Sequence, residues 1–591
     1  MYNPFRCAGF QMEVRYKTLV SRCGVLAVCA LLALWITSPI VATGSWYHGN
    51  QAPLNPYRLS QFCNAFAAGV WYPRWMPEMF GGYGYPTFLF YQPGYFFLTL
   101  PLTYIAGLLH ACEAGIFLAL MAGMFGAYKL ARLWHARWLS LCFAVVFIFS
   151  HDIASTLFIR SDLSELYAML VCPWNAYYLL RLASGVRSQE AVWRGAFGFT
   201  ASTFLIIITH PFVAFWWLPF AAGLMVMQTL TLPYDRRVLT VGAICLALAV
   251  TLAAPYWFTV LQLKHQVHYE WGLLPFNRAF GLMIGKPPFL QAWGYALVAL
   301  LGFAFAWRHR TMRYVACVCV LYFFMMTAWS RPVWAFAYPV LQYTQFSLRL
   351  LAPLTTIVYL GVLQLGLPLM RWHGKDRRHA RLCVGLAVAA ACGVMLVEER
   401  HFHLLWALNP ADRLQPFDYY RVIPEQERSS QMTATHNNEL TPRLAQPDEL
   451  LNRYADGIPI AQFVTPPDRE STLMETPDST PHHIRLRLDL HGVAVVRLNQ
   501  LYFPGWKILM NGQEVRWAAS LPRAEERDRM ALPSPDGRIL LAFPQPGVYR
   551  IEAWYDGPPG WLARNVAVAA TSTLLILLLW PVLRVKEGTA H

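Results

Sequence analysis

Two carboxylates three residues apart stand out in the stretch HDIASTLFIRSDLSELYAMLVCP. Asp162 and Glu165 lie there, directly before a long apolar run. If a helix begins near Ser161, the two side chains share one face, and ionisable groups at a membrane boundary are costly to bury and often functional. A like-charged pair whose pKa is raised could act as a general base. A solvated loop that contains an Arg–Asp pair is the alternative interpretation.

Further side chains that could bind an anion or move a proton occur at three other places. Arg160 precedes the carboxylate pair, and His210 stands before Pro211 in a short turn between two apolar runs. Gln345 and Arg349 open another apolar run, in the sequence LQYTQFSLRLL. An arginine there could anchor a lipid phosphate, or it could extend to the membrane surface and keep its charge hydrated. A lone histidine at such a turn is more often a helix-end residue than a catalyst.

The stretch from His48 to Tyr95 is rich in glycine, proline, arginine and aromatic residues. Arg58 and Arg74 could each hold a phosphate through two parallel hydrogen bonds, and the tyrosine and tryptophan rings could stack on sugar faces. A rigid aromatic loop at the membrane interface is the alternative. The residue types alone favour neither interpretation.

Composition places these residues in a membrane protein. Of the 591 residues, 56% are hydrophobic and 14% are charged, whereas about a quarter are charged in soluble chains. The apolar residues fall in runs of about 20, the length that spans a bilayer core of roughly 30 Å. We expect an α-helical polytopic protein with about twelve transmembrane helices. The expected spans are 23–43, 114–131, 138–152, 165–184, 193–209, 212–231, 238–258, 291–307, 313–329, 350–370, 381–397 and 561–583.

Basic residues orient these spans. The formal net charge is +15, and the basic clusters lie in the short loops that are cytoplasmic when the N-terminus is cytoplasmic. This pattern explains the charge without nucleic-acid binding and places the C-terminus in the cytoplasm as well. Stretch 94–110 is then a re-entrant or interfacial helix, because a further crossing would reverse every later cluster. The outer loop 44–113, the carboxylate pair, His210 and Arg349 all fall on the non-cytoplasmic face, where they could meet in one cavity.

A separate extramembrane segment, 398–560, carries more charge and proline and has no long apolar run. Its strands are expected at 484–490, 493–498, 506–510, 513–517, 539–543 and 548–555, from alternating or continuous apolar patterns. Asn511-Gly512 suits the positive φ angles of a type I′ hairpin turn. We expect a C-terminal extracytoplasmic antiparallel β-sandwich-like domain. The expected domains are a transmembrane domain over residues 1–397, this β-rich domain, and a last helix with a short cytoplasmic tail, 561–591.

The twelve cysteines indicate no metal site. Most lie inside apolar runs, and neither CxxC nor another metal-ligand spacing occurs. Small buried hydrophobic residues explain them best. We therefore predict no metal ligands and no cofactor; a divalent metal is compatible with the chemistry, but no spacing supports one.

Several motifs resemble those of a known group of membrane proteins. In chain order they are YRL at 57–59, YPRW at 72–75, GGYGYP at 81–86, RSDLSE at 160–165, THP at 209–211, QFSLRLL at 345–351 and LYFPGWKILMNG at 501–512. Together they resemble bacterial GT-C-fold membrane proteins, in particular the YfhO-like group, which includes 6-pyruvoyl-tetrahydropterin-synthase-related membrane proteins. The resemblance covers nearly the whole chain, and the YPRW and GGYGYP motifs are its more specific segments.

A GT-C relation implies a polyprenyl-phosphate-linked sugar donor, a non-cytoplasmic active site and an acidic residue in the first outer loop. In the related pattern HD-x-x-x-H-x-x-R the final arginine corresponds to Arg58, but Gln51 stands where the acid is expected. Glutamine cannot act as a base. The base would then be Asp162 or Glu165, with Glu78 a further candidate. Otherwise the chain has kept a cavity that binds the lipid-linked sugar but has lost catalytic activity.

These expectations define a membrane glycosyltransferase-like protein of the bacterial inner (cytoplasmic) membrane. It would transfer a sugar from a polyprenyl-phosphate donor to an envelope glycan, lipid or protein. The alternative is a catalytically inactive accessory or binding protein in polysaccharide assembly; a transporter is disfavoured because ionisable residues are almost absent from the middle of the spans. Arg58, Arg349 and Arg160 would bind the donor phosphate. The residues expected to line the sugar site are Trp75, Tyr83, Tyr85, Gln51, Glu78, His210 and Gln345.

Overall fold

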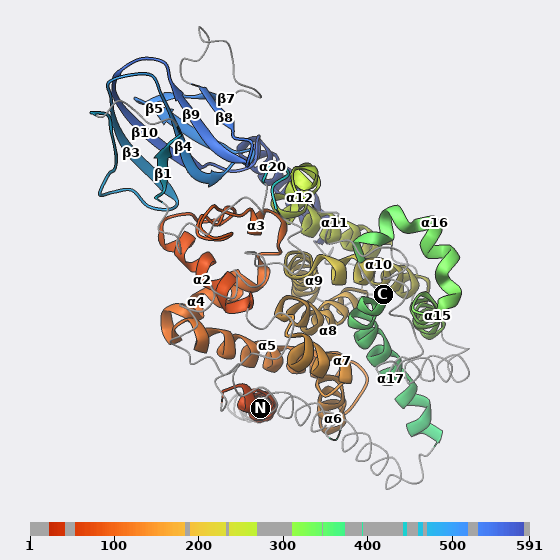
Figure 1. Cartoon of the computed structure of the whole chain (residues 1–591). Helices are drawn as coiled ribbons and strands as arrows, with labels where there is room; N and C mark the ends of the chain where they lie inside the picture. Colours follow the sequence, from red (N-terminus) through yellow and green to blue (C-terminus); the bar gives the residue numbers. More distant parts are fainter. Residues whose placement is uncertain are drawn as a thin grey trace, which may run out of the picture.

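The computed structural model of the chain consists of a helical body and a β domain (Figure 1). It describes residues 23–41, 54–183, 189–231, 236–268, 310–344, 347–372, 393, 441–445, 459–464, 470–517 and 530–583. The expected spans 291–307 and, apart from residue 393, 381–397 lie outside these residues, as do the site candidates Gln51 and Gln345.

Helices make up most of the described chain. They are a first helix over Cys23–Val41, then α2 (Leu54–Ala67), α3 (Thr87–Phe90), α4 (Gly94–Ala106), α5 (Leu108–Ala131), α6 (Arg137–Ile148), α7 (His151–Ala154), η1 (Ser155–Arg160), α8 (Leu163–Ala183), α9 (Gln189–Thr209), α10 (Pro211–Thr231), α11 (Arg236–Leu252), α12 (Ala254–Leu263), η2 (Lys264–Gln266), α15 (Arg310–Met325), η5 (Ala328–Ser330), α16 (Arg331–Leu341), η6 (Gln342–Thr344), η7 (Ser347–Leu350), α17 (Leu351–Trp372) and α20 (Trp561–Leu583). Among the described residues, six helices are long and apolar enough to cross a membrane, or up to nine if each of three bent pairs is one span. The chain is therefore a membrane protein, and the number of twelve spans stays a prediction.

Three of the apolar segments are sharply bent. The bent pairs are Arg137–Ile148 with His151–Arg160 (48°), Val238–Leu252 with Ala254–Gln266 (58°) and Arg310–Met325 with Ala328–Thr344 (85°). Proline occupies the first turn after one of these bends, at Pro255, and the first turn of α16 beyond another, at Pro332. Since proline has no N–H to donate to the preceding turn, a helix readily breaks there. The bends interrupt the expected continuous spans 238–258 and 313–329.

One apolar helix is too short to cross a bilayer. Helix α4 has 13 residues, or about 20 Å at 1.5 Å per residue, against a hydrocarbon core of roughly 30 Å. Gly107, with a φ of 75°, separates it from the long helix α5. This length fits the re-entrant or interfacial helix expected at 94–110, although its place in a membrane stays a prediction.

Helix α8 lies at the centre of the helical body, and a buried amide fixes its neighbours. Asn175 donates hydrogen bonds from Nδ2 to Ser202 Oγ (2.9 Å) and Thr203 Oγ1 (2.8 Å) on α9. Trp217 Nε1 on α10 donates to Asn175 Oδ1 at 2.9 Å. These bonds hold α8, α9 and α10 together below the ends that carry the candidate site.

The β domain contains two five-stranded sheets. The strands are β1 (Ala461–Phe463), β2 (Thr472–Glu475), β3 (His483–Leu490), β4 (Ala494–Leu501), β5 (Trp506–Met510), β6 (Gln513–Glu514), β7 (Arg516–Trp517), β8 (Met530–Pro533), β9 (Arg538–Phe543) and β10 (Gly547–Tyr555). Their orders are β1-β4-β9-β8-β7 and β2-β3-β10-β5-β6. Every pair is antiparallel except β7 with β8. On β3 the side chains of Ile484, Leu486 and Leu488 are all buried, as the period-two pattern predicts.

The hairpin predicted at Asn511-Gly512 is confirmed. β5 pairs antiparallel with β6, and the φ angles of these two residues are 52° and 77°. Asn511 also pairs with Arg550 on β10, because its Oδ1 accepts the Arg550 N–H (2.8 Å) and its own N–H donates to the Arg550 carbonyl (2.8 Å). The turn thus continues the sheet beyond the ladder of β5.

The first outer loop is attached to the β domain through Gln500, a fully buried residue of β4. Its Nε2 donates to the carbonyls of Pro77 (3.2 Å) and Gly82 (3.0 Å), and its Oε1 accepts from Trp75 Nε1 (3.0 Å). One amide therefore satisfies three polar groups of the loop at once. This joins the loop and the β domain (upper left in Figure 1) into one packed unit.

We expect Gln500→Leu to weaken this attachment by about 2 to 4 kcal/mol, because each unsatisfied buried partner costs about 1 to 3 kcal/mol and the loop can relax to some extent. Limited proteolysis of the purified protein should then cut between residues 69 and 86 at least tenfold faster than in the wild type. The exposed Gln513→Leu on β6 is the matched control and should be cut at the wild-type rate. Equal rates for both variants would show that Gln500 does not hold the loop.

Candidate active site

The two carboxylates come together at the start of α8. Ser161 has a left-handed backbone (φ 51°) that ends η1, and Asp162 then caps α8: its Oδ1 accepts the Glu165 N–H (3.2 Å) and its carbonyl accepts the Leu166 N–H (2.9 Å). Asn55 on α2 donates from Nδ2 to the Ser161 carbonyl at 2.7 Å. The first outer loop is thereby tied to the residue that precedes the pair.

Glu165 is ion-paired rather than paired with Asp162. Arg160 Nη1 and Nη2 donate to the two Glu165 carboxylate oxygens at 3.0 and 2.9 Å, and Nη2 also donates to Thr156. The Glu165 side chain is 1% exposed. A bidentate guanidinium contact favours the ionised carboxylate, so Glu165 does not fit the expected role of a base with a raised pKa. The same contact occupies both terminal nitrogens of Arg160, so its expected role in binding the donor phosphate does not fit either.

His210 faces both carboxylates from the connection between α9 and α10. Its Nδ1 accepts the Val213 N–H (3.3 Å), so the neutral ring carries its proton on Nε2. That nitrogen lies 4.0 Å from Asp162 Oδ2 and 3.9 Å from Glu165 Oε2. Burial lowers the pKa of His210, and the two carboxylates offset this only partly, which favours the neutral ring.

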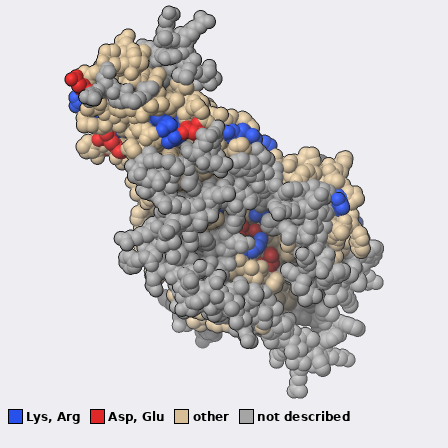
Figure 2. Space-filling view, viewed as in Figure 1, with Lys and Arg blue, Asp and Glu red and all other residues tan. Residues whose placement is uncertain are grey.

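Two further arginines reach this cluster from distant segments of the chain. The Arg58 guanidinium of α2 stacks on the Tyr91 ring at 4.0 Å, and that of Arg349 in η7 stacks on the Phe212 ring at 4.5 Å. Tyr91 interacts electrostatically with both arginines and with Asp162. The structure thus brings together arginines and carboxylates from separate segments. Figure 2 shows a hollow in the helical body in which basic and acidic side chains are visible.

A third buried carboxylate, Asp152 on α7, lies behind the pair. Thr355 Oγ1 of α17 donates to Asp152 Oδ2 at 3.3 Å. Asp152 interacts electrostatically with Arg160 and Glu165, so it belongs to the same cluster of ionisable groups. Sequence reasoning did not single out Tyr91 or Thr355 as site residues. Tyr91 lies in the aromatic-rich stretch that was considered as a possible binding loop. Thr355 lies within an apolar span, where nothing in the sequence indicates a site residue.

The donor atoms of Asp162, Glu165 and His210 lie within 4.8 Å of one another, close enough to surround a metal ion. Their bonding does not fit one. Nε2 of His210 carries the proton when Nδ1 accepts from Val213, and both Glu165 oxygens are occupied by Arg160. A ligating nitrogen must offer a lone pair. We therefore derive no step through a metal.

The other expected site residues lie elsewhere. Trp75 stacks on Tyr555 (5.6 Å) and Tyr85 stacks on Phe80 (5.6 Å). Trp75, Tyr83 and Tyr85 are all at most 4% exposed, and they pack between the loop and the β domain or within the loop. Their burial does not fit the expected role of lining a sugar.

Glu78 is also engaged away from the cluster. Its Oε2 accepts hydrogen bonds from Gln61 Nε2 (2.9 Å) and Asn64 Nδ2 (3.2 Å), both on α2. It therefore fastens the loop to α2, and this geometry does not support it as the base.

These elements define a class: a polytopic membrane protein with a buried ionic cluster and a β domain attached to its first outer loop. No family model matches the chain, and no curated protein matches it. Among solved structures, it is similar to a cryo-electron-microscopy structure of the mycobacterial arabinofuranosyltransferase AftD, with 18% identity and a TM-score of 0.38. The match covers 63% of this chain but only 28% of that one. The likeness is too weak to assign a family.

Proposed function

We propose that this protein is a GT-C-like, polyprenyl-phosphate-dependent glycosyltransferase. It would transfer a sugar to an envelope glycan, lipid or protein on the non-cytoplasmic face of the bacterial inner membrane. The observation that carries the proposal is the arrangement of Arg58, Arg349 and Asp162, which come from three distant segments. Arg349 lies over Phe212, whose ring packs on His210, and His210 Nε2 lies 4.0 Å from Asp162 Oδ2; Arg58 lies over Tyr91, which interacts with all three. Two cations for a phosphate and a carboxylate for an acceptor hydroxyl are what such a transfer requires.

The arginines have the geometry to hold a lipid phosphate. Each holds its guanidinium over an aromatic ring, at 4.0 Å for Arg58 and 4.5 Å for Arg349, and a guanidinium in such a contact can still bind a phosphate through its N–H groups. As the glycosidic bond breaks, negative charge grows on the departing polyprenyl phosphate. Arg58 and Arg349 would stabilise that charge in the transition state.

Asp162 is the better candidate for the base. Glu165 is neutralised by Arg160, whereas the Asp162 oxygen Oδ1 accepts the Glu165 N–H. The other oxygen, Oδ2, would take the proton of the acceptor hydroxyl. The hydroxyl oxygen then bonds to the anomeric carbon, and the bond from that carbon to the phosphate oxygen breaks. His210, whose Nε2 lies 4.0 Å from Asp162 Oδ2 and 3.9 Å from Glu165 Oε2, would position Asp162.

The second candidate function is a catalytically inactive accessory or binding protein in envelope polysaccharide assembly. Gln51 favours it, because this residue stands where the resembling family carries an acid. In that case the arginines would still bind a lipid-linked sugar, but changing Asp162 would have no chemical consequence.

The test is a mass-spectrometric profile of envelope glycans and lipid-linked sugars in the host. The wild type, a deletion strain and the deletion strain complemented with Asp162→Asn, Glu165→Gln or Arg58→Ala protein would be compared at matched expression. We expect the deletion to lose one sugar and accumulate its polyprenyl carrier, and Asp162→Asn to fail to restore the profile. Restoration by every variant would favour the accessory function instead. An unchanged profile in the deletion strain would refute the glycosyltransferase.

A further inference from the structure

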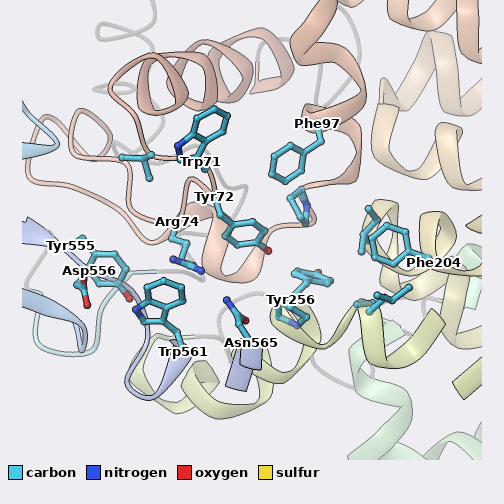
Figure 3. A pocket seen from close by; sticks show the side chains of 16 residues that line it. Trp71, Tyr72, Arg74, Phe97, Phe204, Tyr256, Tyr555, Asp556, Trp561 and Asn565 are labelled. Atoms are coloured by element: carbon cyan, nitrogen blue, oxygen red, sulfur yellow. The ribbon is translucent and has the colours of Figure 1, made fainter. Parts of the chain in front are cut away.

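A second cavity lies apart from the ionic cluster, where the first outer loop, the helical body and the β domain meet. It has a volume of about 510 Å³ and opens to the surface. Its apolar wall is formed by α4, α9, α11 and α12 and includes Phe97, Phe204 and Leu252. Figure 3 shows Phe97 and Phe204 on one side of this space and Arg74, Tyr555 and Trp561 on the other. The cavity is thus apolar at one end and cationic at the other.

Arg74 supplies the positive charge. Its guanidinium lies 4.7 Å from the centre of the Tyr72 ring and 4.9 Å from that of Trp561, so it contacts two aromatic faces. The backbone at Gly557 lies close to this guanidinium, because a Cβ at position 557 would be only 3.0 Å from Arg74 Nη1. Among the described residues Arg74 forms no hydrogen bond and no ion pair. Its side chain lines the cavity (Figure 3).

The surroundings of Arg74 favour an anion. Arg564, one turn into α20, adds a second positive charge within electrostatic range. Burial lowers the pKa of Arg74, and Arg564 lowers it further, whereas nearby tyrosines and Asp556 offset this only partly. Asp556 is the one carboxylate in the described lining; it is exposed, and its Oδ1 accepts from Trp554 Nε1 at 3.4 Å. A bound anion would relieve the repulsion between the two arginines.

The cavity adjoins an exposed apolar surface of the helices α12 and α20. Leu562 and Val566 on α20 and Phe258 and Leu261 on α12 are large apolar side chains with 45 to 64% of their surface exposed. Trp71, at the edge of the cavity, is 77% exposed, and tryptophan favours the headgroup layer of a bilayer. An apolar cavity that ends in an arginine and adjoins exposed apolar surface matches a lipid chain joined to a phosphate.

We propose that this cavity binds a membrane glycerophospholipid, with its phosphate on Arg74 and an acyl chain along Phe97, Phe204 and Leu252. The site is separate from Asp162 and its partners and does not depend on the glycosyltransferase proposal. By filling the space between the loop, α12 and α20, the lipid would stabilise the attachment of the β domain.

Photo-crosslinking of the purified full-length protein in maltoside micelles tests this. The probe is phosphatidylglycerol with a diazirine on one acyl chain, and the labelled peptides are identified by mass spectrometry. We expect labelling of the peptides that contain Phe204 and Leu252. A diacylglycerol probe with the same chains should label them at least about tenfold less, because a charge-assisted phosphate contact contributes that much binding.

Four variants complete the design. Arg74→Gln removes the charge, and Asn565→Phe fills the cavity from α20 without altering Arg74; both should lower labelling about tenfold. Arg485→Gln, a matched loss of one arginine on β3 away from the cavity, should not. Asp162→Asn should label normally, which separates this site from the transfer reaction. Equal labelling by both probes, wild-type labelling of Arg74→Gln, or displacement by undecaprenyl phosphate at concentrations where phosphatidylglycerol does not compete would each overturn the proposal.

Discussion

Replacing Asp162 by asparagine is expected to lower sugar transfer at least about a hundredfold, since a positioned general base contributes roughly 10²- to 10⁴-fold. Stability should not change. Asparagine caps a helix as well as aspartate does, so the hydrogen bond from the Glu165 N–H to the side chain at 162 would be kept. Transfer would be measured with purified protein and a polyprenyl-phosphate sugar, and stability by thermal unfolding.

Two further variants sharpen this experiment. Asp162→Ala should lose the same activity and also about 1 kcal/mol of stability, the usual effect of removing a helix cap. Glu113→Gln changes another buried carboxylate, one bonded to His110 on α5 at 2.9 Å, and should leave transfer unchanged. If Asp162→Asn transfers sugar at the wild-type rate, Asp162 is not the base.

The second large effect is expected from breaking the Arg160–Glu165 pair. Arg160→Met would leave the buried Glu165 charge without its guanidinium and should destabilise the protein by about 3 kcal/mol, the usual cost of an uncompensated buried charge. The double variant with Glu165→Gln should recover most of that loss. Unfolding free energies in mixed micelles would give the coupling energy, expected at about 1 to 3 kcal/mol.

An exposed ion pair provides the comparison. Arg485 and Asp478 in the β domain are joined at 2.8 Å, but their side chains are 33% and 66% exposed. Since water and salt screen such pairs, Arg485→Met should cost less than about 1 kcal/mol. A coupling energy near zero for Arg160 and Glu165 would mean that the pair does not hold the start of α8 in place.

Much of the fold and some of the site follow from patterns that are local in the sequence. Alternating apolar residues predicted β3, and Asn511-Gly512 predicted the hairpin. The distribution of basic residues over the loops predicted that Asp162, His210 and Arg349 lie on one face of the membrane. The structure brings these residues together, although their side of the membrane stays a prediction.

What the sequence could not predict depends on contacts between distant segments. The side chains of Trp75, Tyr83 and Tyr85 could stack on sugars or pack in a core equally well. They pack in a core because β4 lies against the loop that carries them. The spacing of Asp162 and Glu165 suggested a like-charged pair. The π-helical turn η1 and the left-handed Ser161 instead bring Arg160 onto Glu165. No pattern in the sequence predicts that Glu165 pairs with Arg160 instead of Asp162.

The attachment of the loop to Gln500 has a consequence for biosynthesis. The hydrogen-bond partners Gly82 and Gln500 are 418 residues apart in the chain. A ribosome that adds 5 to 20 residues per second needs roughly 20 to 80 s to cover that distance. During this interval the loop is already translated, while the strand that satisfies its carbonyls does not yet exist. Nascent chains are therefore most vulnerable to proteases at the loop, and any premature stop before β4 leaves that vulnerability permanent.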